Sequence, residues 1–354
     1  MAGTVGAAGP PMARLRILCV VTAGLAACSG DHAAPVGVDP DEVGPGEGGK
    51  ADGANAWLPD VRCSEDPATG PSEPWQRPFH SPLIALGSPV HRGIDLVASA
   101  DQAVQIVRGE ISYGVADKAL DDEWVDVYAC RAGIWRYLDR TMTDDEGRFE
   151  LALTGADRLP IGIRDLLVSV AGDRTSTRFV ALVAPAAGNL AVSDIDGTLT
   201  SSETAFATAV ITGSDVAPHP DAPQALHAIR AAGYAPVYLT ARGRYFTSHT
   251  RTWLEQHGFP RGALRLASGI GSLPGDSTIE HKITAMLEIA ASDLVIAIGI
   301  GNRASDQAAY QTLAVPGELT FLKQQEYADE VAPLVDAGDA IGFDDYAELV
   351  ARFQ

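Results

Sequence analysis

Apolar residues follow three different patterns along the 354-residue chain. Residues 28–74 are rich in Gly, Pro, Asp and Ala and have no apolar periodicity. Such a segment cannot bury a core and is predicted to be a flexible tether. Residues 75–186 carry short β-type runs separated by turn residues, which predict a small antiparallel β-sandwich-like domain. Between residues 187 and 354 strand-like and helix-like runs alternate, and this alternation predicts a parallel sheet with helices on both faces.

The alternating region is regular enough to predict individual elements. The predicted strands, each apolar along its length as a buried parallel strand should be, cover residues 189–195, 235–240, 264–268 and 293–300. The predicted helices cover residues 222–233, 244–258, 280–291 and 304–314. The expected fold class is therefore α/β, with a Rossmann-like parallel sheet whose ligands bind beyond the carboxyl ends of the strands.

The first residues carry the pattern of an export signal. Arg14 and Arg16 precede a short apolar stretch, and small residues follow in the sequence LAAC, which ends at Cys28. This arrangement predicts a signal peptide over residues 1–27. The LAAC sequence resembles the lipobox of bacterial lipoproteins, which implies cleavage before Cys28, lipidation of that cysteine and a lipid-anchored, extracytoplasmic location in a bacterial cell envelope. A plain signal peptide with an incidental cysteine is the alternative.

The overall charge restricts the partners. The formal net charge is −20, which makes general nucleic-acid binding unfavourable and repels anionic membrane surfaces. Attachment to a membrane therefore needs another source of attraction, which a lipid anchor supplies. In an exported protein, Cys63 and Cys130 either pair as a disulfide or remain two isolated thiols, and the sequence leaves both possibilities open.

Polar side chains stand at the ends of the predicted parallel strands. Asp194 and Asp196 follow the first strand, Thr240 follows the second, and Asn302 and Asp306 follow the fourth. Because the carboxyl ends of parallel strands meet along one edge of a sheet, these side chains are expected to share one crevice.

Two carboxylates two residues apart point to opposite faces of an extended strand. Gly197 permits a sharp bend directly after them, so that both carboxylates can face the crevice. A divalent cation relieves the repulsion between two close carboxylates, and oxygen ligands without a His or Cys cluster favour Mg²⁺. The predicted metal ligands are Asp194, Asp196, Asn302 and Asp306.

The same crevice contains groups suited to a phosphate. Lys282 opens the helix before the fourth strand, and Thr240, Ala241 and Arg242 follow the second strand. These four residues are the predicted phosphate-binding set. A carboxylate nucleophile, a second carboxylate, a lysine and Mg²⁺ together suit phosphoryl transfer through an aspartyl-phosphate intermediate.

Four sequence motifs carry a family resemblance. DIDGTLT, YLTARG, the lysine of HKITAML and GNRASDQAAY resemble the four motifs of haloacid dehalogenase-like phosphatases, and more narrowly the lipin-type (LNS2) catalytic domain. The resemblance covers residues 188–325 and implies a haloacid dehalogenase-like Rossmannoid fold. The β domain directly before VSDIDGT also resembles the domain order of App1-type phosphatidate phosphatases, although their first motif usually has an aspartate where this chain has Gly197.

The resemblance implies roles for individual residues. It makes Asp194 the nucleophile, Asp196 the general acid and base, Thr240 and Lys282 phosphate binders, and Asp306 a metal ligand. Lipins share an asparagine at the position corresponding to Asn302, whereas many other dehalogenase-like enzymes carry an acid there. Both groups of relatives hydrolyse phosphatidic acid to diacylglycerol with Mg²⁺.

The spacing between the motifs suggests an uncapped site. The segments from Thr200 to Pro223 and from Thr240 to Lys282 are too short to hold an inserted cap domain. An open crevice suits a large or membrane-embedded phosphate ester. Four arginines near the predicted mouth are expected to present positive charge to a phosphate headgroup, namely Arg242, Arg244, Arg251 and Arg303.

The sequence therefore predicts a lipid-anchored, Mg²⁺-dependent phosphatidate phosphatase whose substrate is a membrane phospholipid. Two alternatives remain. The first is an extracytoplasmic phosphatase of soluble phosphate esters that uses the same mechanism. The second is a non-catalytic phosphatidate-binding module.

Overall fold

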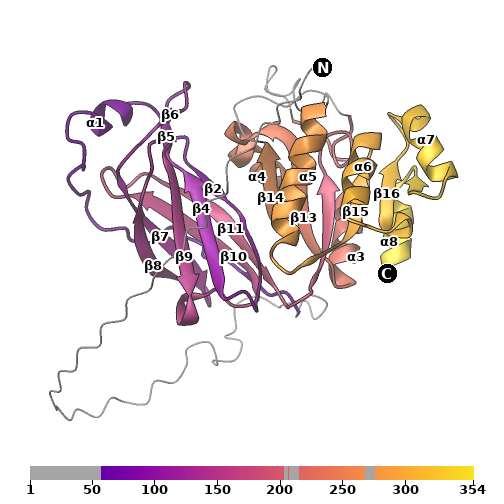
Figure 1. Cartoon of the computed structure of the whole chain (residues 1–354), viewed down its shortest axis with the longest axis horizontal. Coiled ribbons are helices and arrows are strands. Elements are labelled where there is room, and N and C mark those ends of the chain that lie inside the picture. Colours follow the sequence, from indigo (N-terminus) through magenta and orange to yellow (C-terminus); the bar gives the residue numbers. More distant parts are fainter. Residues whose placement is uncertain (1–56, 203–205, 207–214, 268–275) are drawn as a thin grey trace, which may run out of the picture. The chain divides into compact units, whose positions relative to one another are not determined.

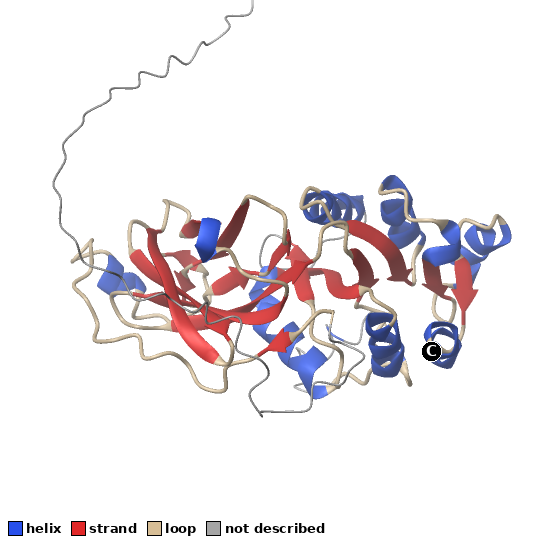
Figure 2. Cartoon of the chain, turned by 90° about the horizontal axis from the view of Figure 1, so that it is seen from below, coloured by secondary structure: helices blue, strands red, loops and turns tan. Residues whose placement is uncertain are grey.

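The structure is a computed structural model in which the predicted β domain and α/β domain are both present (Figures 1 and 2). All described residues lie in one compact unit of the chain. They are residues 57–202, 206, 215–267 and 276–354. The predicted signal peptide, Cys28 and residues 28–56 of the predicted tether lie outside this described part. No helix of the described residues is both long enough and apolar enough to cross a membrane.

The β domain packs a large sheet against a smaller one around an apolar core. The large sheet has the strand order β3-β11-β10-β7-β8, with β1 beside β10, and the small sheet has the order β2-β4-β9. The strands of the large sheet are β1 (Asp60–Val61), β3 (Leu96–Ser99), β7 (Trp124–Arg131), β8 (Ile134–Met142), β10 (Gly162–Val170) and β11 (Ser176–Ala184). The remaining strands are β2 (Arg92–Ile94), β4 (Val104–Glu110), β9 (Arg148–Thr154) and the hairpin β5 (Ser112–Tyr113) and β6 (Lys118–Ala119).

Most strand pairs of this domain are antiparallel, as the sequence predicts, but β1 with β10 and β3 with β11 are parallel. Along β9, buried and exposed residues alternate, which is the pattern of a strand with one face on a core. All nine residues of β10 are buried, because Leu166 and Val168 face the sandwich core while Ile163 enters a second core.

The end of the predicted tether is folded, which corrects its boundary at residue 74. Leu58 is fully buried, and β1 pairs with β10. Cys63 forms a disulfide with Cys130 of β7, so the possibility of two isolated thiols is wrong. The composition of this segment is that of a tether, but these three contacts attach it to the β domain.

Removal of this disulfide is expected to lower the free energy of unfolding by about 4 kcal/mol, because the bond closes a loop with a sequence separation of 67 residues. The measurement compares urea denaturation of the wild type, with and without reductant, with that of a Cys63→Ser, Cys130→Ser double variant. Reduced wild type and double variant should agree. A double variant as stable as the oxidised protein would contradict the pairing.

The α/β domain is built on six parallel strands in the order β14-β13-β12-β15-β16-β17. These are β12 (Asn189–Asp194), β13 (Ala235–Gly243), β14 (Ala263–Ala267), β15 (Val295–Gly301), β16 (Thr320–Lys323) and β17 (Ile341–Phe343). In chain order the arrangement is 3-2-1-4-5-6, the doubly wound order in which ligands bind where the order reverses, beside the first and fourth strands. The predicted fold class is therefore confirmed, and the reversal lies at β12 and β15.

The helices cover both faces of this sheet. Helices α5 (Asp276–Ala290) and α6 (Ala304–Thr312) contribute to the core on one face. Helices α3 (Ala222–Ala231), α4 (Thr247–Gln256) and α8 (Tyr346–Phe353) contribute to the core on the other. Leu190 and Val192 of β12 face the first core and Ala191 faces the second, as side-chain alternation requires. Four elements were not predicted from the hydrophobic pattern, namely β16, β17, α8 and α7 (Ala328–Asp336).

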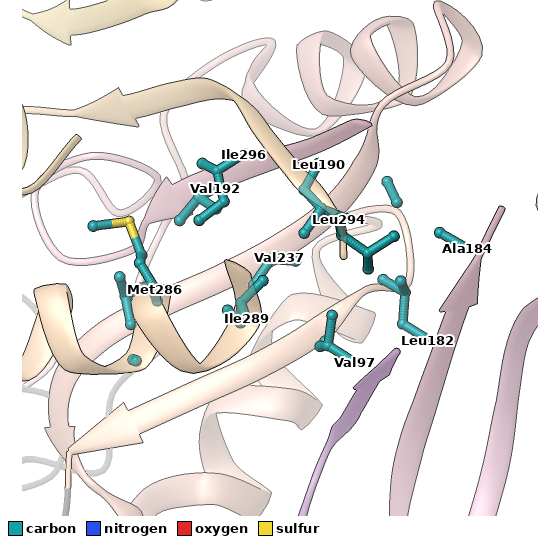
Figure 3. Close-up of a cluster of buried hydrophobic side chains, with 14 of the residues drawn as sticks. Val97, Leu182, Ala184, Leu190, Val192, Val237, Met286, Ile289, Leu294 and Ile296 are labelled. Carbon is teal, nitrogen blue, oxygen red and sulfur yellow. The ribbon is translucent and has the colours of Figure 1, made fainter. Parts of the chain in front are cut away.

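The two domains share a hydrophobic core. Figure 3 shows Val97, Leu182 and Ala184 of the β domain beside Leu190 and Leu294 of the α/β domain. All of these side chains are buried. Part of the apolar surface of the β domain is therefore buried against the α/β domain.

Buried ion pairs also join the domains. The Asp95 carboxylate, between β2 and β3, accepts hydrogen bonds from the Arg251 guanidinium of α4 and from the backbone N–H groups of Val180 and Leu264. Its side chain has 0% exposure. Arg261 of the α/β domain pairs with Asp165 of β10. Both contacts hold charged groups that are costly to bury unpaired.

Candidate active site

The predicted crevice forms at the carboxyl ends of β12, β13 and β15. β12 ends at Asp194, and its neighbours on either side are β13, which contributes Thr240, and β15, which leads into Asn302. Gly197 has φ 69°, so the predicted bend after the two aspartates is present at a residue without a Cβ. Thr200 accepts a hydrogen bond from the Gly197 backbone N–H and closes this turn.

Asp194 is held by a lysine and a threonine. Lys282 Nζ donates to Asp194 Oδ1 at 2.6 Å, and Thr198 Oγ1 lies 3.0 Å from Asp194 Oδ2. The same Thr198 oxygen is 3.1 Å from Asn302 Oδ1. Asp194, the candidate nucleophile, is therefore held in position. Its Oδ1 atom accepts from the Lys282 ammonium group, and its Oδ2 atom accepts from the Thr198 hydroxyl.

Lys282 joins two carboxylates inside the protein. Its ammonium group donates to Asp194 and, at 2.5 Å, to Asp306 Oδ1, and its side chain is 6% exposed. Burial lowers the pKa of Lys282, but the two carboxylates outweigh that effect and raise the pKa above its ordinary value. Lys282 is therefore a permanent cation at neutral pH, as charge neutralisation of a phosphate requires.

Asp306 is a structural anchor of the crevice. Its Oδ2 accepts hydrogen bonds from the backbone N–H groups of Asn302 and Arg303, so that this carboxylate in the first turn of α6 binds the backbone that leads into the helix. A Cβ at Gly301 would lie 2.4 Å from the Asp306 Cβ, which explains the glycine before Asn302. Asp306 thus orients both Lys282 and the Asn302 backbone.

Asp196 has a different set of partners. Thr240 Oγ1 donates to Asp196 Oδ2 at 2.9 Å, and Arg242 Nη2 donates to Asp196 Oδ1 at 2.6 Å. The Asp196 side chain is 16% exposed and the Arg242 side chain 2%. Asp196 is thus the more accessible of the two aspartates, and its charge is neutralised by a buried arginine.

Thr240, Ala241 and Arg242, which were predicted to follow the second strand and bind phosphate, lie within β13 near its carboxyl end. The hydroxyl of Thr240 and the guanidinium of Arg242 are directed at Asp196, and Arg242 also lies over the Phe206 ring at 3.7 Å. Ala241 lies where the register of β13 against β14 shifts between Thr240 and Gly243. The structure therefore joins Lys282 to Asp194, and Thr240 and Arg242 to Asp196.

The four arginines that were expected to present positive charge at the mouth of the crevice are neutralised by acidic side chains. Each of the four arginines forms an ion pair with a carboxylate. The pairs are Arg242 with Asp196, Arg244 with Glu110, Arg251 with Asp95, and Arg303 with Glu330. The sequence could not show this neutralisation, because Glu110 and Asp95 belong to the other domain.

The oxygen donors nearest Asp194 fit Mg²⁺ in type. Asp194 Oδ2 and Asn302 Oδ1 both lie about one hydrogen-bond length from Thr198 Oγ1, and hard oxygen donors suit this ion. Within the described part of the chain, no group of three His, Cys, Asp or Glu side chains is arranged to hold a metal. Of the four predicted ligands, Asp194 and Asn302 share the Thr198 hydroxyl, and Asp306 is joined to both through Lys282 and the Asn302 backbone N–H. Asp196 instead binds Arg242.

Three residues of the site were not singled out by the sequence analysis. Thr198 connects Asp194 with Asn302. Tyr310 donates from its hydroxyl to the backbone carbonyls of Ile300 and Val192, and so ties β15 to β12. Tyr346 of α8 donates to the Thr198 carbonyl at 2.8 Å. Thr198 and Tyr310 stand inside the recognised motifs, whereas nothing in the sequence marked Tyr346.

The fold and this constellation define a two-domain protein whose α/β domain carries a phosphatase-type residue set. Residues 191–323 match the family model for the LNS2 domain of PITM 1-3, and residues 89–183 match the model for the beta-sandwich domain of PITM 1-3. This match supports the predicted resemblance to LNS2 domains, and the matching model is that of PITM 1-3. Two successive parts of the chain are thus similar, in chain order, to two domains of PITM 1-3.

Curated relatives include human membrane-associated phosphatidylinositol transfer protein 2, 28% identical over 69% of this chain and 18% of that protein. The Drosophila melanogaster protein retinal degeneration B is 24% identical over 80% of this chain and 22% of that protein. The chain thus spans about a fifth of the length of these relatives. Among solved structures, the class C acid phosphatase from Bacillus anthracis is 19% identical, covers 47% of this chain and 78% of its own, and has a TM-score of 0.30.

Proposed function

We propose that the protein is a Mg²⁺-dependent phosphatidate phosphatase that hydrolyses phosphatidic acid to diacylglycerol and phosphate. The observation that carries the proposal is the position of Asp194, held between the Lys282 ammonium and the Thr198 hydroxyl at the carboxyl end of β12. A carboxylate fixed in this way, beside a permanent cation, suits attack on the phosphorus of a phosphate ester.

The reaction has two balanced steps. In the first, an Asp194 oxygen bonds to phosphorus, the P–O ester bond breaks, and the leaving alkoxide takes a proton from Asp196. In the second, a water oxygen bonds to phosphorus while Asp196 takes a proton of that water, the bond between phosphorus and the Asp194 oxygen breaks, and phosphate leaves with the Asp194 carboxylate restored. The ion pair with Arg242 and the hydrogen bond from the Thr240 hydroxyl hold the Asp196 side chain in position.

Asp194 and Asn302 would hold Mg²⁺, which when bound neutralises phosphate oxygens. Lys282 balances the charge of Asp194 and Asp306 and presents its ammonium group to the transferred phosphoryl group. Asp306 keeps Lys282 and the Asn302 backbone in place.

Two observations support a lipid phosphate as the substrate. Among the described residues, the helical residue Phe206 and α3 lie between β12 and β13, and a short 3₁₀ turn, α4 and β14 lie between β13 and α5, so these described residues form no cap domain over the crevice. The relatives are named as membrane-associated phosphatidylinositol transfer proteins, which links their chains to phospholipids. The two regions of this chain that are similar to domains of PITM 1-3 are the part that it shares with them.

Phosphate release from phosphatidate vesicles is the direct test. We expect turnover of vesicles with Mg²⁺, a loss of at least about 100-fold after chelation, and recovery when Mg²⁺ is restored. Glycerol 3-phosphate serves as the matched soluble ester and should be the poorer substrate. Faster hydrolysis of the soluble ester would favour a phosphatase of soluble esters, and activity unaffected by chelation would contradict the metal requirement.

A non-catalytic phosphatidate-binding module is the second candidate. Two observations favour it: Asp196 forms an ion pair with Arg242, and relatives are named as phosphatidylinositol transfer proteins. The two candidates differ in one experiment, which combines a turnover assay with vesicle binding. Phosphatidate-dependent binding without phosphate release from any ester would establish the binding module.

We further propose that the protein acts outside the cytoplasm, anchored through Cys28. The disulfide between Cys63 and Cys130 supports an oxidising compartment. Metabolic labelling with a fatty-acid probe tests the anchor, and a Cys28→Ser variant that is labelled as strongly as the wild type would exclude it.

A further inference from the structure

One end of the β domain exposes four large apolar side chains. They are Phe79, Leu83, Leu86 and Val115, whose exposed fractions are 91%, 68%, 83% and 89%, respectively. Phe79, Leu83 and Leu86 belong to the turn around helix α1 (Ser81–Ile84), and Val115 lies in the β5–β6 turn. We call these four residues the apolar tip. Single exposed apolar residues are ordinary, but four at such exposure on two adjoining loops are not.

The two loops of the apolar tip adjoin and are firmly held. The Gly114 backbone N–H donates to the Ser88 carbonyl at 2.7 Å, and a Cβ at Gly87 would lie 2.8 Å from the Gly114 nitrogen. Leu86 and Val115 each neighbour one of these glycines, so they lie close together. Figure 1 shows α1 beside β5 and β6.

The helix beneath the tip is fixed to the core. Ser81, fully buried, donates from its hydroxyl to Glu123 Oε1 at 2.6 Å, and Ile84 packs against the sandwich core. The two Glu123 oxygens also accept the backbone N–H groups of Gln76 and Arg77. The exposed side chains are thus presented by a rigid support.

A chain of ion pairs connects the apolar tip with the catalytic end of the α/β domain. Asp117, two residues after Val115, pairs with Arg92. Arg92 also pairs with Glu110 at 3.1 Å, and Glu110 pairs with Arg244 at 2.5 Å. Arg244 directly follows β13, whose end carries Thr240 and Arg242. In Figure 1, α1 and the β5–β6 hairpin lie toward the same end of the molecule as the carboxyl ends of the parallel strands.

The charge around the apolar tip distinguishes between occupants. Arg77 pairs with Asp121 and Asp122, and His80 lies 3.4 Å from Asp121, so these basic groups are balanced by acids. A surface without excess positive charge does not attract anionic headgroups. Protruding apolar side chains on a rigid support instead suit insertion into the acyl-chain boundary of a bilayer.

We propose that the apolar tip is a bilayer-docking surface that inserts its side chains among lipid acyl chains and orients the catalytic crevice toward the membrane. The occupant is the apolar interior of the bilayer and not an anionic headgroup. This goes beyond the proposed reaction and does not depend on it, because docking is measured without turnover.

Site-specific fluorescence in the full chain tests the docking. A Phe79→Trp variant is mixed with vesicles of phosphatidylcholine brominated on its acyl chains. The matched control, Ile134→Trp, replaces a 57% exposed apolar residue at the start of β8, beyond the carboxyl end of β7. We expect added quenching, relative to wild type, for Phe79→Trp and none for Ile134→Trp. Roughly 1 M salt should leave this quenching unchanged. Because quenching reports the depth of one residue, a lipid anchor elsewhere in the chain does not produce it.

A second substitution tests the contribution of the neighbouring side chains. Adding Leu86→Ser to the Phe79→Trp variant should weaken vesicle-dependent quenching about tenfold, whereas adding Ile134→Ser should not. Equal quenching of Phe79→Trp and Ile134→Trp would overturn the proposal. A blue-shifted Phe79→Trp emission without vesicles would also overturn it, because the shift would show that protein covers the apolar tip. A blue shift that grows with protein concentration would identify a second copy of the chain as the cover. A blue shift independent of concentration would identify another segment of the same chain. Phosphatidate hydrolysis without this quenching would overturn docking and leave the proposed function standing.

Discussion

Asp194→Asn is expected to lower phosphate release from every phosphate ester by at least about 10⁴-fold, because an amide cannot act as the attacking carboxylate. The substitution keeps the shape of the side chain and one oxygen that accepts a hydrogen bond. Lys282 also retains its pairing with Asp306. The folded structure is therefore expected to persist. The measurement is the initial rate of phosphate release, with circular dichroism and thermal unfolding as checks of folding.

The matched control for this experiment is Asp339→Asn, the same chemical change at an exposed residue just after α7. Its activity should equal that of the wild type. If Asp194→Asn keeps more than a tenth of the wild-type rate, the nucleophile assignment is wrong. If the wild type itself is inactive while both variants bind phosphatidate vesicles equally, the non-catalytic candidate is favoured.

Asp95→Ala is expected to lower the free energy of unfolding by about 3–5 kcal/mol, because the change leaves the charge of Arg251 without its partner at a largely buried interface. The backbone N–H groups of Val180 and Leu264 lose their acceptor at the same time. The measurement is urea denaturation followed by tryptophan fluorescence and far-ultraviolet circular dichroism. Because the two domains share a core, both probes should report the same transition.

Two comparisons control this experiment. Asp95→Asn retains an oxygen acceptor and should cost less than Asp95→Ala. Asp66→Ala removes a carboxylate that is 57% exposed and pairs with Arg178, so it should change stability by no more than about 1 kcal/mol. An Asp95→Ala loss as small as that of Asp66→Ala would show that the interdomain ion pair contributes little.

The local features of the site could be predicted because each depends on neighbours in the chain. The apolar run of β12, the glycine bend at Gly197 and the capping position of Asp306 are set by residues within a few positions. The alternating strand and helix pattern then brings the strand ends together by the topology of parallel sheets. For that reason the predicted strands and helices from residue 189 to 314 agree closely with the observed ones.

The partners of each charged side chain could not be predicted in this way. Arg251 and Arg244 bind acids of the β domain, and Tyr346 reaches Thr198 from the last helix. These contacts join residues more than 100 positions apart. No periodicity of the sequence relates residues so far apart. From the sequence, Arg244 and Arg251 were therefore expected to present positive charge, whereas in the structure their charges are neutralised by Glu110 and Asp95.

The sequence by itself determined the order of the two domains, the parallel α/β class and the identity of the acidic and basic residues at the strand ends. It did so because hydrophobic periodicity and glycine or capping positions act over short stretches of chain. Only the tertiary structure decided that Cys63 pairs with Cys130, that Lys282 joins Asp194 to Asp306, and that Arg242 binds Asp196. These pairings depend on which distant segments pack together, and the burial that makes them strong exists only in the folded chain.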